Sequence, residues 1–158
     1  MPLILVRHAK AISRKKAILH GIPDSERALT EKGRNSFISH VQENLDLFVD
    51  TNLFVTSPYI RATQTLELLI NSLPATAAPV EVLPNITPDD GADSLANWLQ
   101  EHDHRKIVIV SHEPFISNFL IHATAGRWSP QKIKKGAFVI VTQIGRGLKV
   151  KIVGIEKN

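Results

Sequence analysis

Two histidines and two arginines follow short apolar runs and together could bind and attack a phosphoryl group. Arg7 and His8 follow one run, and His112 stands just after a second. Arg61 comes shortly after a third run. A neutral imidazole, with an ordinary pKa of about 6.5, is a usable nucleophile at neutral pH. Guanidinium groups stay charged and bind phosphate oxygens through paired hydrogen bonds. Since these side chains supply the positive charge, the pattern predicts phosphoryl chemistry without a metal ion.

The three apolar runs are expected to be strands that position these side chains. They cover residues 3–6, 53–56 and 106–110. Short uninterrupted apolar segments rich in branched residues are typical of strands buried on both faces of a parallel sheet. In open α/β sheets, ligands bind beyond the carboxyl ends of the strands. The sequence therefore predicts one cationic pocket at that end of the sheet.

The remaining segments alternate between predicted helices and strands. One helix is expected to start near residues 29–33, with Thr30 as its N-cap. Three further helices are expected at residues 61–73, 94–101 and 114–124. Further strands are expected at 80–83, 137–143 and 148–155, the last two joined by a hairpin turn, while residues 10–28 are expected to form a long loop. This order predicts an α/β fold with a three-layer α/β/α sandwich, a mostly parallel central sheet and a C-terminal antiparallel hairpin. We expect residues 1–158 to form a single domain.

Composition narrows the possible classes of protein. The chain of 158 residues is 43% hydrophobic and carries a formal net charge of +4. It has no cysteine, which excludes disulfides and thiolate metal sites and favours a cytoplasmic location. No apolar stretch is long enough to span a membrane, and the few aromatic residues do not alternate with basic ones as nucleic-acid binding would favour. The basic residues form two clusters: Lys10, Arg14, Lys15 and Lys16, and then Lys132, Lys134 and Lys135.

Four segments resemble motifs of one enzyme family, and they follow one another along the chain in the order that the family has. Residues 6–9 (Val-Arg-His-Ala) resemble an Arg-His-Gly signature, and residues 57–65 resemble a Ser-Pro-x-x-Arg-Ala-x-Gln-Thr segment. Residues 27–33 resemble an Arg-Pro-Leu-Thr-x-x-Gly helix start, and residues 110–112 match a second histidine motif. The chain thereby resembles the histidine phosphatase superfamily, also called phosphoglycerate-mutase-like. Its length, its 83–88 loop and its 111–114 turn are most similar to the short SixA-type phosphohistidine phosphatases.

The resemblance implies roles for individual residues. His8 would be the nucleophile that carries the phosphoryl group as phosphohistidine. Arg7, Arg61 and His112 would complete the catalytic pocket, and Arg27 would help to bind the substrate. The family uses no metal and no cofactor, and its fold is a central sheet flanked by helices.

The chain departs from the family pattern at two places. Ala9 replaces a glycine, so the backbone after His8 has less conformational freedom. Asn85 stands where many family phosphatases have an acid that protonates the leaving group. The alternative candidates for this acid are Asp89, Asp90, Asp93 and Glu113, each of which could instead serve in a turn or as a helix cap.

Several functions are compatible with these residues. The leading hypothesis is a metal-independent phosphatase, monomeric, that acts on phosphohistidine in a protein partner such as a histidine phosphotransfer domain. The second is a phosphatase of small phosphate esters or nucleotides, and the third a phosphate-binding module without turnover. A mutase is less favoured, because it must shield its phosphoenzyme from water and this chain is short. An imidazole leaves more readily than an alkoxide, so the missing acid supports the first hypothesis.

Overall fold

The computed structural model describes residues 2–102 and 105–155, which contain one six-stranded sheet. The strands are β1 (Leu3–Arg7), β2 (Leu53–Thr56), β3 (Val80–Val82), β4 (Ile107–Ser111), β5 (Phe138–Ile144) and β6 (Gly147–Val153), in the spatial order β3-β2-β4-β1-β5-β6. Strands β1 to β4 pair in parallel, whereas β5 runs antiparallel to both β1 and β6. This confirms the predicted, mostly parallel sheet with a C-terminal hairpin.

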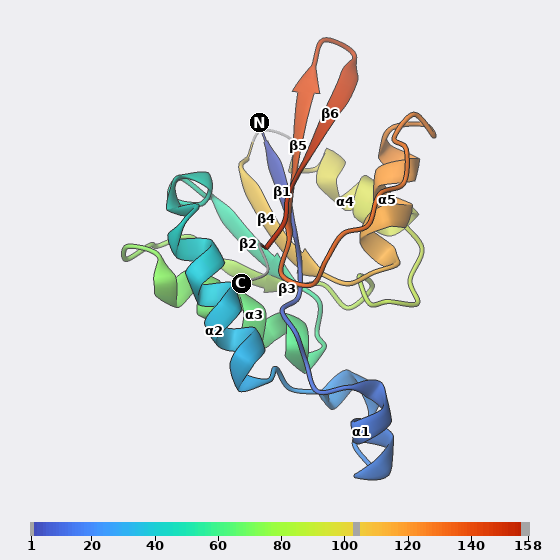
Figure 1. Ribbon diagram of the computed structural model, residues 1–158. Coiled ribbons are helices and arrows are strands. Elements are labelled where there is room, and N and C mark those ends of the chain that lie inside the picture. The colour runs from blue at the N-terminus through green and yellow to red at the C-terminus, as the bar shows by residue number, and fades with distance from the viewer. Residues whose placement is uncertain (1, 103–104, 156–158) are drawn as a thin grey trace.

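Helices cover both faces of this sheet. They are α1 (Arg14–Leu19), α2 (Glu31–Gln42), α3 (Ile60–Ser72), α4 (Asp93–Gln100) and α5 (Phe115–Ala123), with 3-10 helices η1 (Asp24–Glu26) and η2 (Leu45–Leu47). Figure 1 shows α2 and α3 on one face, α4 and α5 on the other, and α1 beyond one end of the sheet. The three predicted layers are therefore confirmed. Within the described ranges, no helix combines the length and the hydrophobicity that crossing a membrane requires.

The central strands are buried on both faces, which explains their uninterrupted apolar sequences. In β1, Ile4 and Val6 belong to the core beneath α2 and α3, whereas Leu5 belongs to the core beneath α4 and α5. Successive side chains of a strand point to opposite faces, so both faces of β1 need apolar residues. The sheet is thus held rigidly where its carboxyl ends lead into the candidate site.

The start of α2 is hydrogen-bonded to Lys10, in the segment that follows His8. Thr30 is the N-cap, as predicted, because its hydroxyl oxygen accepts a hydrogen bond from the Gly33 amide at 2.9 Å. The Thr30 amide in turn donates to the carbonyl of Lys10 at 3.0 Å. A Cβ atom on Gly33 would lie only 2.2 Å from that carbonyl oxygen. Glycine is therefore required at this close approach of two backbones.

The prediction of a loop over residues 10–28 is wrong in part. The segment contains α1 and η1, and the Ser13 hydroxyl caps α1 by accepting from the Lys16 amide at 3.1 Å. Ala17 is the buried residue of α1. A six-residue helix that buries so little apolar surface has no amphipathic repeat, so its sequence carries no periodic signal.

Candidate active site

Two histidines meet at the carboxyl ends of β1 and β4. Arg7 pairs with Ser111 in the parallel register, and the His8 amide donates to the Ser111 carbonyl at 3.0 Å. This register places His8 and His112, the next residue of each chain segment, side by side. Their ring centroids lie 5.1 Å apart, and both side chains are buried. The strand pairing itself therefore builds the centre of the site.

The hydrogen bonds of His8 identify the ring nitrogen that could act as a nucleophile. Nδ1 lies 2.7 Å from the Ala9 carbonyl oxygen. Because a carbonyl oxygen can only accept, Nδ1 carries the proton and Nε2 keeps a free electron pair. The Arg61 Nε–H group donates to this Nε2 atom at 3.3 Å. The neutral imidazole thus presents its basic nitrogen to a guanidinium group.

The backbone at Ala9 tolerates a side chain. Among the described residues other than glycine, Ala125 is the one with a positive φ, at 51°. The position after His8 therefore does not need the conformational freedom of the glycine found in the family motif. The Ala9 amide donates to the Thr65 hydroxyl at 2.9 Å, which ties this turn to α3.

Burial and nearby cations keep both histidines neutral. Burial, together with the charges of Arg61 and Arg7, lowers the pKa of His8 to about 3, against the opposing effect of its hydrogen bond to the Ala9 carbonyl. Burial, with smaller contributions from His8 and Arg61, lowers the pKa of His112 to about 2. Both imidazoles are accordingly uncharged at neutral pH, which is the state that nucleophilic attack requires of His8.

Arg61 is buried at the first turn of α3 and is held by the segment before α2. Its side chain is 2% exposed. Nη1 donates to the Asp24 carbonyl at 2.6 Å, and Nη2 lies 3.3 Å from the Asp24 Oδ2 atom. The Arg61 carbonyl accepts from the Thr65 hydroxyl at 2.7 Å. The guanidinium is therefore fixed between the nucleophile candidate and a carboxylate.

Arg7 is positioned by the loop that precedes β5. Its Nη1 donates to the Ile133 carbonyl at 2.6 Å, and the Gly136 amide contacts the carbonyl oxygens of Arg7 and His8, both at 3.0 Å. Burial lowers the pKa of Arg7, and the charge of Glu113 opposes that change. The buried Nε–H of Arg7 has no hydrogen-bond partner within the described chain. It is a donor from which a phosphoryl oxygen could accept.

His112 offers a second donor of this kind. Its Nε2 lies 2.7 Å from the Ser57 hydroxyl oxygen, which itself accepts from the Tyr59 amide at 3.3 Å. The hydroxyl proton of Ser57 is therefore available to donate to Nε2, which leaves the ring proton on Nδ1. That buried Nδ1 atom has no hydrogen-bond partner among the residues described.

Asp24 is a residue of the site that sequence reasoning missed. Its carboxylate contacts Arg61 and accepts from Arg27 Nε at 2.9 Å, while Arg27 Nη1 donates to the Ile12 carbonyl at 2.8 Å. Burial raises the pKa of Asp24, but Arg61 and Arg27 outweigh it and bring the pKa below its usual range. Asp24 is therefore ionised at neutral pH and is no proton donor. Within its turn-rich segment, no spacing distinguishes this carboxylate from an ordinary turn residue.

The candidate acids lie in different surroundings. Asp89 and Asn85 are exposed, and the exposed Asp93 lies 3.7 Å from His122. Asp90 accepts from the Thr87 amide and hydroxyl at 2.8 and 2.7 Å, as a turn residue does. Glu113 accepts from the Ser117 amide and hydroxyl at 2.9 and 2.5 Å, and its charge acts on Arg7. Of the four carboxylates, Glu113 is thus the one coupled to a residue of the site.

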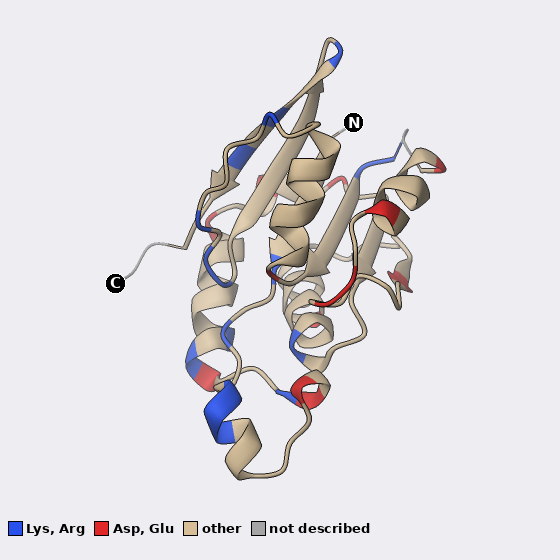
Figure 2. Cartoon of the chain, turned by 90° about the vertical axis from the view of Figure 1, so that its right-hand side faces the viewer, with Lys and Arg blue, Asp and Glu red and all other residues tan. Residues whose placement is uncertain are grey.

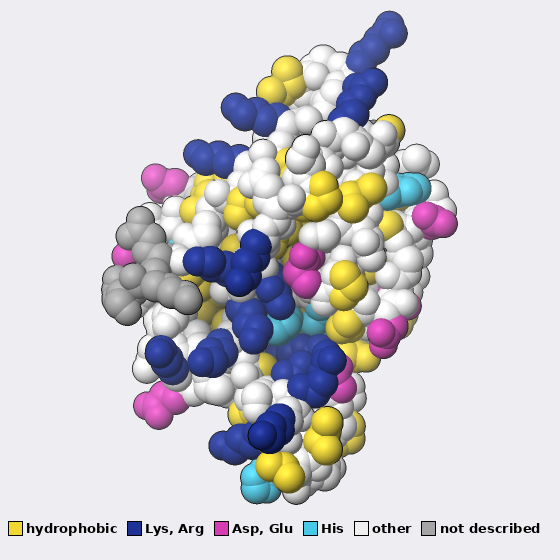
Figure 3. Space-filling model, turned by 45° about the vertical axis from the view of Figure 1, so that its right-hand side comes forward, with side chains coloured by type: hydrophobic (Ala, Val, Ile, Leu, Met, Phe, Trp, Pro, Cys, Tyr) yellow, Lys and Arg dark blue, Asp and Glu magenta, His cyan; other side chains and the backbone are white. Residues whose placement is uncertain are grey.

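The two basic clusters, distant in sequence, come together around the histidines. Burial lowers the pKa of Lys135, and Arg7, Arg27, Lys10 and Arg61 lower it further through their charges. Figure 2 marks the basic segments in α1 and in the loop before β5. In the space-filling view, histidine side chains lie in a hollow bordered by Lys and Arg (Figure 3). The arrangement suits a substrate with several negative charges.

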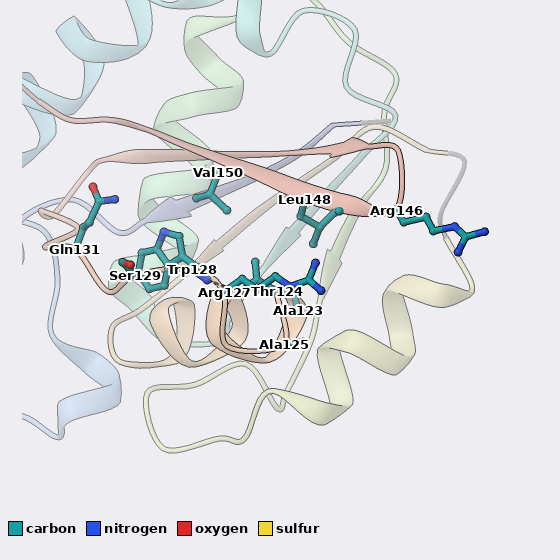
Figure 4. A pocket seen from close by; sticks show the side chains of 11 residues that line it. Ala123, Thr124, Ala125, Arg127, Trp128, Ser129, Gln131, Arg146, Leu148 and Val150 are labelled. Atoms are coloured by element: carbon teal, nitrogen blue, oxygen red, sulfur yellow. Dashed lines mark hydrogen bonds between the residues drawn. The ribbon is translucent and has the colours of Figure 1, made fainter.

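A separate cavity of about 570 Å³ lies away from this site. Its walls come from the turn after α5 and from the β5–β6 hairpin, and they include Trp128, Arg127 and Arg146 (Figure 4). None of the histidines or arginines of the candidate site lines it.

Comparisons with known proteins agree with this geometry. The model of the histidine phosphatase superfamily (branch 1) matches residues 3–87. The solved structure of the protein histidine phosphatase SixA complexed with tungstate superposes with a TM-score of 0.80 at 23% identity, over 96% of this chain and 94% of that one. The structure of the alpha-ribazole phosphatase from Shigella flexneri superposes with a TM-score of 0.74 at 17% identity, over 100% of both chains.

A phosphoserine phosphatase from Entamoeba histolytica, in complex with 3-phosphoglyceric acid, gives a TM-score of 0.69 at 14% identity over 94% of both chains. No curated protein sequence matches the chain. At these identities the structural likenesses confirm the predicted fold and leave the substrate open.

Proposed function

The chain belongs to the histidine phosphatase superfamily (branch 1), and on that premise we propose that it is a metal-independent phosphatase of phosphohistidine in a protein. The observation that carries this proposal is the state of His8. Its pKa of about 3 keeps the ring neutral, and its Nδ1 bond to Ala9 leaves Nε2 unprotonated, with an electron pair that accepts from Arg61 Nε at 3.3 Å.

In the first step, His8 Nε2 attacks the phosphorus atom in line with the leaving imidazole. The Nε2–P bond forms while the bond from phosphorus to the substrate nitrogen breaks, and the departing imidazole keeps the electron pair and takes a proton from solvent. Arg61, Arg7 Nε and His112 Nδ1 would donate to the equatorial oxygens, where charge collects. The Ala9 carbonyl, which accepts from Nδ1 at 2.7 Å, would stabilise the positive charge of the phosphorylated ring.

In the second step, water attacks the phosphohistidine of the enzyme. The water oxygen bonds to phosphorus as the P–Nε2 bond breaks, Nε2 regains its electron pair, and the protons of the water leave with inorganic phosphate or pass to solvent. No step requires a metal ion or an organic cofactor, because the charge of the phosphoryl group is balanced by arginine.

The surroundings of the carboxylates support phosphohistidine as the substrate. A positioned acid that protonates a leaving alkoxide contributes roughly 10² to 10⁴ in rate. Asp24 is ionised, Asp90 is bound to Thr87, and Asn85 cannot serve as an acid. An imidazole departs without such help, so a site with this set of residues favours it over an alkoxide.

One observation favours a second candidate, a phosphatase of small phosphate esters or nucleotides. Glu113 directly follows His112, and its charge acts on Arg7. A protonated Glu113 could deliver a proton to a departing oxygen. The fold is also that of an alpha-ribazole phosphatase and of a phosphoserine phosphatase.

A turnover assay separates the two candidates. A chemically phosphorylated histidine phosphotransfer domain and free phosphohistidine are compared with alkyl phosphates of increasing leaving-group pKa, with and without EDTA. We expect kcat/KM to be higher for the phosphoramidates, the difference to widen as the leaving-group pKa rises, and EDTA to have no effect. Equal efficiency with alkyl phosphates would contradict the proposal, and a selective loss of ester hydrolysis in Glu113→Gln would then identify the acid.

We further propose that the enzyme acts in the cytoplasm as a monomer formed by one domain, residues 1–158. The absence of cysteine from the sequence supports a reducing compartment. The four central side chains, Arg7, His8, Arg61 and His112, meet within a single copy of the described residues. Sedimentation of the active enzyme at its assay concentration tests the monomer.

A further inference from the structure

The end of helix α1 exposes two neighbouring apolar side chains close to the candidate active site. Ile18 and Leu19 are 71% and 74% exposed, the highest values among the exposed large hydrophobic residues of the described chain. Single exposed apolar residues are common on protein surfaces, whereas contiguous apolar surface rimmed by polar residues marks interaction sites. Folding of the chain alone does not account for this pair, because neither side chain is removed from water.

Helix α1 is fixed to the site on both of its sides. Before the helix, the Ile12 amide donates to the Ala28 carbonyl at 2.9 Å, and the Ile12 carbonyl accepts from Arg27. After it, Asp24 binds Arg61. A helix of six residues is only about 9 Å long, so its apolar end remains close to these anchors. A macromolecule that reaches the pocket would therefore meet α1 as well.

The surface between α1 and the pocket is basic. The basic rim consists of Lys10, Arg14, Lys132, Lys134 and Lys135, all exposed. Figure 3 shows hydrophobic side chains next to basic ones at the lower end of the molecule, below the hollow that holds the histidines. A complementary surface would carry carboxylates opposite the rim and an apolar patch opposite Ile18 and Leu19.

We propose that the end of α1 and the basic rim form the docking surface for the phosphorylated protein. The partner is one whose phosphohistidine is flanked by acidic side chains and by an apolar patch that covers Ile18 and Leu19. This inference rests on the proposed function, since it assigns the surface around the same pocket. A lipid surface fits less well, because membrane-binding helices are longer and carry a continuous apolar face, whereas α1 offers two apolar side chains.

Four phosphohistidine peptides of equal length test the chemistry of the partner. They combine acidic or neutral flanks with leucines or serines at neighbouring positions, and free phosphohistidine serves as the small substrate. We expect the acidic peptide with leucines to have a kcat/KM at least about tenfold above that of the neutral peptide with serines. The advantage of the acidic flanks should shrink as salt is raised from 0.05 to 0.5 M, because salt screens exposed charges.

A double variant and a matched control test the role of α1. Ile18→Ser with Leu19→Ser should remove the advantage of the leucine peptides and spare the advantage of acidic flanks. The control is Ile144→Ser with Leu148→Ser, which replaces the same two residue types on the β5–β6 hairpin, where they are 59% and 40% exposed. That hairpin projects from the opposite end of the molecule (Figure 1), so the control should retain the full peptide preference. Thermal unfolding verifies that both variants fold.

The outcomes separate this inference from the proposed function. Hydrolysis of free phosphohistidine without any preference among the peptides overturns the docking surface and leaves the phosphatase proposal in place. If the α1 variant loses kcat/KM equally for free phosphohistidine and for all four peptides, the docking surface is also overturned, because α1 would then support the pocket itself. Binding to phosphatidylserine vesicles that depends on Ile18 and Leu19, without peptide preference, would assign the surface to a membrane. Failure of the wild-type enzyme on every phosphohistidine substrate overturns both proposals.

Discussion

The Nε atom of Arg61 lies 3.3 Å from the Nε2 atom of His8, so one guanidinium contacts the proposed nucleophile directly. The other two nitrogens of the same group bind Asp24. A planar group with donors in fixed directions can make these contacts together, whereas an ammonium group cannot. The geometry of the guanidinium, beyond its charge, is therefore expected to matter for catalysis.

Replacement of Arg61 by lysine tests this geometry. Arg61→Lys keeps the positive charge and loses the fork of donors, so kcat/KM for phosphohistidine should fall roughly tenfold or more. The control is Arg127→Lys, an exposed position away from the site. Steady-state rates of both variants provide the measurement. Activity of Arg61→Lys close to that of the wild type would mean that Arg61 does not contact the phosphoryl group.

Asp24 should weaken the binding of phosphate. Its ionised carboxylate contacts both Arg61 and Arg27 and so reduces the positive potential of the pocket. Asp24→Asn removes this charge and keeps an acceptor oxygen, so inorganic phosphate should inhibit about threefold more strongly or better. Inhibition constants from product-inhibition kinetics give the answer. Weaker inhibition would instead show that Asp24 is needed to hold Arg61 in place for the phosphate.

Ser57 is expected to act as a positioning residue through His112. Its hydroxyl oxygen lies 2.7 Å from Nε2 of that ring and accepts from the Tyr59 amide, so we assign the hydroxyl proton to the bond with Nε2 and the ring proton to Nδ1. In Ser57→Ala this preference is lost, and kcat/KM should fall about tenfold. The tautomer of His112 can be followed by the ¹⁵N shifts of the ring, which a purely structural effect would not alter. An unchanged tautomer together with wild-type activity would refute the role.

Stability should decrease with acidification because of three buried histidines with lowered pKa values, of which His8 and His112 belong to the candidate site. The pKa values of about 3 for His8 and about 2 for His112 lie below the ordinary value of 6.5, so between these limits the unfolded chain binds protons that the folded chain does not. Well above pH 6.5 these rings are neutral in both states, so their titration does not change the free energy of unfolding there. Below it, the free energy falls by up to about 1.4 kcal/mol per histidine for each pH unit.

Urea unfolding between pH 7.5 and 4.5 measures this effect. In His112→Gln the decrease below pH 6.5 should be smaller than in the wild type, whereas His20→Gln, at an exposed position, should leave it unchanged. Identical decreases in all three proteins would mean that His112 is not held neutral by burial.

The position of the site could be predicted from the sequence, because its central residues follow strands of the sheet. Arg7 and His8 follow β1, and His112 follows β4, so the pairing of two adjacent parallel strands was enough to bring them together. The N-cap at Thr30 was predictable for a similar reason, since its hydroxyl acts only three residues along the chain. Local sequence patterns and the pairing of strands thus predict most of the fold and the positions of Arg7, His8, Arg61 and His112.

Asp24 and α1 could not be predicted in this way. Asp24 reaches Arg61 across 37 residues of sequence through a 3-10 turn, and nothing in its neighbours specifies that contact. Helix α1 buries little beyond Ala17, so no apolar period reveals it. The meeting of the two basic clusters also depends on tertiary structure, namely on the bond from Arg7 to the Ile133 carbonyl.

The central claim is that His8 carries the phosphoryl group during turnover. Rapid acid-free quenching of the enzyme with ³²P-labelled phosphohistidine substrate, followed by peptide mapping under alkaline conditions, tests it directly. We predict one labelled peptide, phosphorylated on His8, with a bond that is labile in acid and stable in base, and no labelled peptide from His8→Ala, whose unfolding curve should remain cooperative. Label on another residue, or an acid-stable bond, would contradict the account.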